Sequence, residues 1–315
     1  GRHGGSPQDH ATEQAYDGFV AALAGHGLHP GTVVIDDKWQ RTYGGWEADP
    51  AKWPDLRGWI DRRHGAGQHV LLWWKAWDPE GVPDELCVRN RDGLAMGVDP
   101  SNPAYESWLR ECVDRMLGPG GYDADGFKVD FSARTPSGPG LVRHGPEWGI
   151  ELLRRLLWVL YDQAKRTKPD ALVMTHTPHP YFLDVTDMIR LNDVNTRAAV
   201  VPQMRHRASV ARAACPELLV DTDNWPMPGR AEFRAYVEAQ PRLGVPSLYY
   251  ASHLDELPPW SKNRSHVGWA AFARARAEKG APYPDRRARQ VPLSEDDYAL
   301  IRRSWTRAVE GENRG

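Results

Sequence analysis

The sequence predicts an α/β protein with the fold of a TIM-type (β/α)8 barrel that is missing its first strand in this chain. Short apolar runs alternate with helical patterns along the chain, which is typical of a parallel sheet buried on both faces. Acidic residues follow several of these runs, where a barrel places its functional groups. The length of 315 residues and the hydrophobic content of 41% are enough for one large core.

Seven short apolar runs have the length and composition of buried strands. In chain order they are TVVI (32–35), HVLLWW (69–74), GFKVDF (126–131), ALVMT (171–175), DMIRL (187–191), ELLVD (217–221) and PSLYYAS (246–252). A closed barrel has eight strands, and nothing before residue 14 has the pattern of one. We therefore expect the chain to begin after the first barrel strand.

Apolar residues at helical spacing predict a helix in most of the intervals. These helices cover residues 16–23, 54–60, 109–116, 153–160, 197–213, 230–240, 265–279 and 294–309. Ser294 and Asp297 are placed to cap the last of them. We expect one catalytic domain over residues 1–315, with residues 1–13 as a flexible N-terminus and residues 260–315 as closing helices.

A doubly wound open sheet is the alternative fold for the same alternation. It predicts a glycine-rich phosphate-binding turn after the first strand. The sequence has IDDKWQ at that point, and its two carboxylates would repel a phosphate. The barrel is therefore favoured.

Composition and charge exclude several classes of function. The 40 basic and 42 acidic residues nearly cancel, which does not favour binding to nucleic acid or to an anionic membrane. No run of 18 apolar residues is present, so the sequence predicts no membrane span. The three cysteines (Cys87, Cys112 and Cys215) are odd in number and far apart, which argues against a disulfide framework or a zinc ribbon. With no apolar signal segment at the N-terminus, we expect a cytoplasmic protein.

Acidic residues cluster where the predicted strands end. They are Asp36, Asp37, Asp130, Asp193, Asp221 and Asp223. In a parallel barrel all of these strand ends open onto one face. A single acid there is as often a helix N-cap as a functional group, but capping does not readily explain all of them. Without a basic phosphate cradle, the carboxylates indicate recognition of a neutral polyol.

Tryptophan is unusually common, with 14 residues. Core packing explains about half of them. The others lie beside acids and glycines at strand ends, where flat aromatic faces suit the apolar face of a sugar ring. They are Trp39, Trp46, Trp73, Trp74, Trp77 and Trp225.

Asp130 is the most informative acid. Lys128 lies two residues earlier, so both side chains share one face of the strand, and the ammonium favours an ionised carboxylate. An ionised carboxylate suits a nucleophile that attacks an anomeric carbon, and a buried structural ion pair is the alternative. A retaining glycosidase needs a second carboxyl about 5–5.5 Å away, for which Asp193, Asp221 and Asp223 are candidates.

Longer segments match a known pattern in order and with comparable spacing from about residue 32 to 255. They are VVIDDKWQ with KWPDLRGWIDRRHGAGQHVLLWW, VDPSNPAYESWLRECVDRML with GYDADGFKVDF, then MIRLNDV, and finally LLVDTDNWPM. Together they resemble the retaining α-glycosidase barrels of the α-galactosidase type, glycoside hydrolase families thirty-six and twenty-seven, with the family thirty-one α-glucosidases as a related group.

The resemblance implies hydrolysis of α-galactosides or related α-glycosides through a covalent glycosyl-aspartate intermediate, with no cofactor or metal. Asp130 would be the nucleophile and Asp193 the acid/base. The implied substrate-binding residues are Asp36, Asp37, Trp73, Lys128, His176, Arg190 and Asp223. Asp193 follows Arg190 by three residues, one fewer than in the family, and THTPHP (175–180) replaces a Cys/Gly-rich segment that many family thirty-six members carry.

Three other functions are open at this point. A non-catalytic sugar-binding barrel would keep the same polar rim, and a transglycosylase would pass the same intermediate to a sugar instead of water. A metal-dependent barrel hydrolase would use histidines, for which His176, His179, His206 and His253 are available. The spacing of His176 and His179 does not match the paired histidines that such enzymes carry on their first strand.

Overall fold

The computed structural model of the protein describes residues 11–196, 198–256 and 289–311. Its centre is a six-stranded sheet with the strand order β1-β2-β5-β6-β7-β8. These strands are β1 (Thr32–Ile35), β2 (His69–Lys75), β5 (Gly126–Asp130), β6 (Leu172–Thr175), β7 (Met188–Arg190) and β8 (Leu219–Asp221). Every neighbouring pair is parallel.

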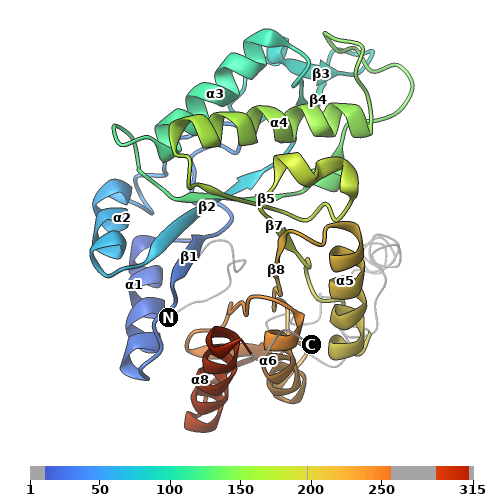
Figure 1. Cartoon of the computed structure of the whole chain (residues 1–315). Helices are drawn as coiled ribbons and strands as arrows, with labels where there is room; N and C mark the ends of the chain where they lie inside the picture. The colour runs from blue at the N-terminus through green and yellow to red at the C-terminus, as the bar shows by residue number, and fades with distance from the viewer. Residues whose placement is uncertain (1–10, 197, 257–288, 312–315) are drawn as a thin grey trace, which may run out of the picture.

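Helices follow the strands and lie in an arc outside the sheet (Figure 1). They are α1 (Glu13–Gly25), α2 (Leu56–Gly65), α3 (Pro103–Leu117), α4 (Ile150–Thr167), α5 (Val200–Ala214), α6 (Arg230–Leu243) and α8 (Glu295–Glu310). Within the described residues, no helix combines the length and the apolar character needed to cross a bilayer.

The first six predicted strands and most of the predicted helices are confirmed, with boundaries that shift by a few residues. The cap of α8 is also as predicted, because the Ser294 side chain accepts from Asp297 N and the Asp297 side chain accepts from Ser294 N. The helix expected at 265–279 and residues 1–10 lie outside the described residues.

The prediction of a TIM-type (β/α)8 barrel that lacks only its first strand is wrong. The sheet is an open half-barrel with β1 at one edge and β8 at the other, and no strand among the described residues joins the two edges. The segment 246–252 is predicted to be the seventh strand, but it contains no strand in the structure.

Side chains take the backbone hydrogen bonds that a strand at 246–252 would have made. Val245, the residue before this segment, forms a single parallel bridge with Asp221 of β8. Beyond it, Ser247 N donates to the Thr222 hydroxyl at 3.1 Å and Tyr249 N donates to Asn224 Oδ1 at 2.8 Å. The run is apolar because it packs in the core beside β8, and burial alone does not require a strand.

A tyrosine hydroxyl caps the opposite edge of the sheet. Tyr16 on α1 donates to the Val34 carbonyl at 3.0 Å and accepts from Asp36 N at 2.8 Å. Gly31 already gives its carbonyl to β2 through His69, and backbone groups alternate between the two sides of a strand. The Tyr16 hydroxyl therefore satisfies groups on the open side of β1.

Two short antiparallel pairs accompany the parallel sheet. They are β3 (Cys87–Arg89) with β4 (Ala95–Val98), and β9 (His253–Glu256) with β10 (Arg289–Pro292). None of these four strands is predicted from the sequence, because each is only three or four residues long and has no pronounced apolar run.

Apolar packing occurs on both faces of the sheet. One large core packs β2 and β5 against α2, α3 and α4, and a second packs β7 and β8 against α5, α6 and α8. On the other face, Leu71, Met174 and Met188 form a small cluster. The sheet is therefore buried on both sides, as its unbroken apolar strands predict.

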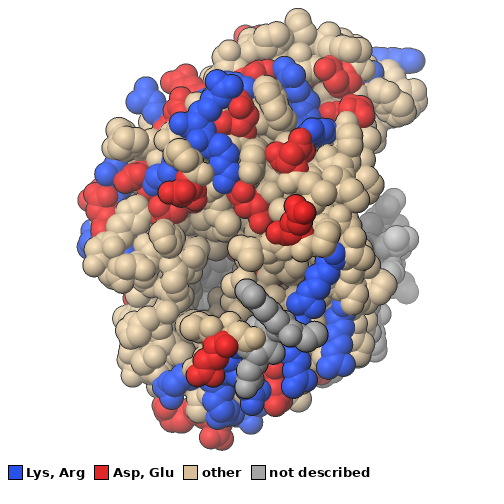
Figure 2. Space-filling view, in the orientation of Figure 1, with Lys and Arg blue, Asp and Glu red and all other residues tan. Residues whose placement is uncertain are grey.

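Charged side chains of both signs are mixed over the helical surface, as the nearly cancelling charges indicate (Figure 2). Between α3 and α4, Arg110 lies 2.9 Å from Glu106 and 2.7 Å from Asp162. Arg155 adds a contact of 2.6 Å to Glu106. This network is a solvated outer face and needs no ligand to explain it.

We predict that Tyr16→Phe lowers the free energy of unfolding by about 1–3 kcal/mol, because two backbone groups of the sheet edge lose their partner. Urea unfolding of the purified protein measures it. Tyr181→Phe is the matched control, since that hydroxyl donates to Glu151 on the surface, and its effect should stay within about 0.5 kcal/mol. Equal effects of the two variants would contradict the role given to Tyr16.

Candidate active site

The acids predicted to share one rim do so. Asp36 and Asp37 directly follow β1, Asp130 and Asp221 are the last residues of β5 and β8, and Asp193 and Asp223 follow within three residues of β7 and β8. None of them is the N-cap of a described α-helix. The capping explanation for these acids is therefore wrong.

Left-handed backbone conformations mark the same strand ends. Outside glycine such values of φ are uncommon and cost conformational energy, and they cluster at functional sites. The residues that follow β1, β2, β5, β7 and β8 with positive φ are Lys38 (64°), Trp77 (73°), Phe131 (59°), Asn192 (69°) and Asp223 (47°). The rim thus combines carboxylates with strained backbone.

Arg190 is at the centre of the rim and is almost completely buried, with 2% of its side chain exposed. Its NH1 donates to Asp193 at 3.1 Å and to Asp223, and its NH2 donates to Asp130 at 3.1 Å. One guanidinium therefore links the ends of three strands. A buried cation favours the ionised form of each carboxylate near it, and the effect is stronger at a shorter distance between the two groups.

Asp130 is held as an ionised carboxylate. Phe131 N donates to Oδ1 at 2.7 Å and Trp73 Nε1 donates to Oδ2 at 3.3 Å. Burial alone would raise the pKa of Asp130, but the hydrogen bond from His176 and the charge of Arg190 outweigh it. The pKa of Asp130 consequently lies well below its usual range.

Asp193 has the opposite shift. Partial burial and the negative charge of Asp223 raise its pKa, although Arg190 acts against them. Its side chain remains 51% exposed, whereas that of Asp223 is 0% exposed. Of the acids that contact Arg190 beside Asp130, Asp193 is the one that can reach a ligand from solvent.

Lys128 binds a different acid from the one expected. It shares a face of β5 with Asp130, as the two-residue spacing predicts, but its Nζ donates to Asp36 Oδ2 at 2.9 Å and contacts the Tyr249 hydroxyl. Its charge still helps to lower the pKa of Asp130. The cation in direct contact with Asp130 is Arg190.

Asp37 keeps an acceptor for a ligand. Burial raises its pKa, and the charge of Asp36 adds to the effect, while the Tyr43 hydroxyl opposes it. Its Oδ1 is buried, and no group of the described residues donates a hydrogen bond to it. A buried oxygen of this kind is costly unless a ligand hydroxyl or water fills the position.

His176 lies beside Asp130, with its Nε2 3.4 Å from Oδ1 and 3.3 Å from the Ser132 hydroxyl.

The tryptophans proposed as sugar platforms are mostly buried, which leaves little ring surface for a sugar. The exposed fractions are 0% for Trp39, 1% for Trp73, 2% for Trp74 and 4% for Trp77. Composition could not separate a ring that lines a site from one that packs beneath it.

Tyr249 and Tyr43 are site residues that the sequence analysis missed. Tyr249 was assigned to a strand, so its hydroxyl was not considered, and the loop that carries Tyr43 had no strand to place it. Tyr43 follows Asp37 by six residues, which was a local signal, whereas Tyr249 is far from every rim acid in the sequence and had none.

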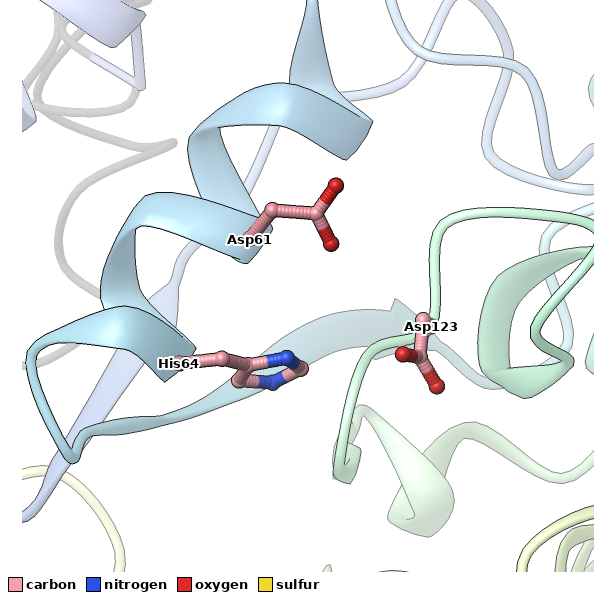
Figure 3. A group of neighbouring side chains, drawn as sticks. All are labelled: Asp61, His64 and Asp123. Atoms are coloured by element: carbon pink, nitrogen blue, oxygen red, sulfur yellow. The ribbon is translucent and has the colours of Figure 1, made fainter.

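A metal site requires histidine or acidic side chains that lie close enough together to share one ion. Within the described residues, the group close enough to share an ion is Asp61, His64 and Asp123 (Figure 3), and it contains none of the four histidines proposed. It lies where β2 and β5 begin, at the opposite end of the sheet from the rim.

The cluster of Asp61, His64 and Asp123 is already neutralised by cations. Arg57 Nε lies 2.8 Å from Asp61, and Lys168 Nζ lies 2.7 Å from Asp123. His64 Nε2 lies 2.8 Å from Asp125. The His64 contact joins α2 to the start of β5, and an added ion would meet the positive charges of Arg57 and Lys168.

The fold is similar to that of solved enzymes named for degrading or forming cycloalternan. No protein-family model and no curated protein matches the chain. The cycloalternan-degrading enzyme from Trueperella pyogenes in complex with a covalent intermediate has a TM-score of 0.63 at 16% identity, covering 99% of this chain and 48% of that one. The same enzyme in complex with isomaltose has a TM-score of 0.62 at 16% identity, covering 99% and 49%.

A third similar structure is the cycloalternan-forming enzyme from Listeria monocytogenes in complex with a pentasaccharide substrate. It has a TM-score of 0.57 at 13% identity and covers 85% of this chain and 29% of that one. The chain thus spans about half or less of the length of these enzymes. At such identities the likeness defines the fold, which is a glycoside hydrolase fold.

We predict that the stability of the protein relative to Asp221→Asn falls as pH rises. Burial and the charge of Asp223 raise the pKa of Asp221 to about 6, so between its ordinary value and 6 the folded state binds more protons than the unfolded state. The difference should change by on the order of 2 kcal/mol between pH 4 and pH 7. Urea unfolding at several pH values measures it, and a difference that does not vary with pH would contradict it.

Proposed function

We propose that the protein is a retaining α-glycosidase in which Asp130 is the nucleophile and Asp193 the acid/base. The observation that carries the proposal is the pair of opposite pKa shifts on two carboxyls that contact one guanidinium. A nucleophile must be ionised and a general acid must hold a proton, and environments that separate two pKa values in this way assign the roles.

The proposed mechanism starts with Asp130 ionised and Asp193 protonated. An Asp130 oxygen bonds to the anomeric carbon while the bond to the leaving oxygen breaks, and Asp193 gives its proton to that oxygen. Asp193, now ionised, takes a proton from water as the water oxygen bonds to the same carbon. The bond from that carbon to Asp130 breaks in the same step, its electron pair returns to the Asp130 carboxylate, and the sugar leaves with its configuration retained.

The surrounding residues suit a neutral sugar. Asp36 and Asp37 can accept hydrogen bonds from hydroxyl groups, and Lys128 can donate to one. The buried Oδ1 of Asp37 supports a bound hydroxyl at that position. Arg190 and Asp223 hold the two catalytic carboxyls in place, and His176 contacts the nucleophile.

Glucose is the first sugar to test. An enzyme with the same fold is seen with isomaltose, an α-linked glucose disaccharide. We therefore propose α-glucosides as the substrates, with the α-galactosides of families thirty-six and twenty-seven as the alternative. The two sugars differ in the orientation of one hydroxyl group, so a comparison of 4-nitrophenyl α-glucoside and α-galactoside decides between them.

We predict that Asp130→Ala lowers kcat by about 10⁴-fold or more while the protein still folds. Azide should restore part of the turnover and yield a β-glycosyl azide, because it can attack from the space left by the carboxylate. Steady-state kinetics and product analysis by NMR measure these effects.

Asp184→Ala is the matched control for the Asp130 experiment, since this exposed acid pairs with Arg154 away from the rim. It should keep the activity of the unmodified protein. Normal turnover by Asp130→Ala would remove Asp130 from the role of nucleophile.

We predict that Asp193→Ala slows turnover of substrates with poor leaving groups by about 10²- to 10⁴-fold. An aryl glycoside with an acidic phenol needs little protonation, so its first step should be nearly unaffected. A pre-steady-state burst of the phenol would then reveal slow release of the sugar. An equal loss on both kinds of substrate would contradict the acid/base assignment.

Transfer to a sugar acceptor is the second candidate reaction. It is supported by the name of one similar enzyme, which forms cycloalternan, whereas another degrades it. The same glycosyl ester serves both reactions. Product analysis with increasing concentrations of isomaltose distinguishes them, because a transferase builds longer oligosaccharides as the acceptor concentration rises.

A further inference from the structure

The two oxygens of the Asp130 carboxylate have different surroundings. Oδ1 accepts from two donors, Phe131 N at 2.7 Å and Arg190 NH2 at 3.1 Å, and His176 Nε2 lies 3.4 Å away. Oδ2 accepts from one donor among the described residues, Trp73 Nε1, at 3.3 Å. A carboxylate oxygen has two lone-pair positions, so Oδ1 is saturated and Oδ2 is not.

We propose that Oδ2 of Asp130 is the oxygen that bonds to the anomeric carbon, and that Trp73 is a positioning residue that aims it. This inference rests on the proposed function. Oδ1 would remain the carbonyl oxygen of the glycosyl ester and keep its two donors, Phe131 N and Arg190 NH2, throughout the reaction.

The chemistry favours this division of roles. When Oδ2 forms its bond to the anomeric carbon, the leaving oxygen takes the electron pair of the broken bond, and the carboxylate loses its charge. In the second step the bond to Oδ2 breaks and the charge returns to the carboxylate. Donors fixed on Oδ1 stabilise that returning charge without having to move.

The geometry of both donor groups is set before any ligand arrives. Phe131 adopts a left-handed conformation with φ of 59°, and its N–H donates to the carboxylate of the preceding residue at 2.7 Å. Trp73 is 1% exposed, and its ring packs against Phe131 and Tyr43 at centroid distances of 6.0 and 5.8 Å. Its backbone carbonyl is held by Trp39 Nε1 at 2.8 Å.

The decisive experiment is a crystal structure of the trapped intermediate. Incubation with 5-fluoro-α-glucosyl fluoride should accumulate the glycosyl ester, and peptide mass spectrometry should place it on Asp130. We expect the anomeric carbon to be bonded to Oδ2, with Oδ1 still in contact with Phe131 N and Arg190. A bond to Oδ1 would overturn the inference and leave the proposed function intact, whereas an ester on another residue would overturn the proposed function.

A second measurement tests Trp73 itself. In Trp73→Phe the indole donor is lost, and kcat should fall about 10- to 100-fold with KM nearly unchanged, as for the loss of one hydrogen bond to a charged group. Trp53→Phe is the matched control, because that buried indole donates to the Ala11 carbonyl at 2.8 Å, away from Asp130. A loss no larger than that of the control, or one confined to KM, would overturn the role of Trp73.

Discussion

The buried guanidinium of Arg190 is the contact on which the site depends. It touches Asp130, Asp193 and Asp223, which come from the ends of three different strands. Without its charge these carboxylates would repel one another in a region with little solvent screening, and removing one partner from such a group is costly. The same contact helps to lower the pKa of Asp130. The contacts of Arg190 therefore serve both the stability of the rim and, together with His176 and Lys128, the ionisation of Asp130.

At both open edges of the sheet, side chains close to the site form hydrogen bonds with backbone groups. Tyr16 pairs with the outer edge of β1 next to Asp36, and Asn224 holds the backbone of Tyr249 beside β8. Tyr249 in turn contacts Lys128 on β5. A sheet that does not close into a barrel leaves backbone groups to be satisfied, and here the groups that satisfy them lie beside Asp36 and Tyr249, the two contacts of Lys128.

Much of the fold could be predicted because burial leaves a local pattern. Apolar runs located β1, β2 and β5 to within a residue or two, and the acids at their ends predicted a common rim. The run at 246–252 failed because an irregular segment packed in the core is as apolar as a strand. The positions of the tryptophans could not be predicted for a related reason. Composition does not distinguish a ring such as Trp39, which packs in the core, from one that faces a ligand.

The sequence by itself determined the parallel strands, the helices between them and the gathering of acids at one end. These features depend on the spacing of residues along the chain and on the direction shared by parallel strands. Only the tertiary structure decided that the sheet stays open, that Lys128 pairs with Asp36, and that Arg190 joins Asp130 to Asp193. A pKa depends on burial and on charges brought close through space, so residues far apart in the sequence set the protonation of each carboxyl.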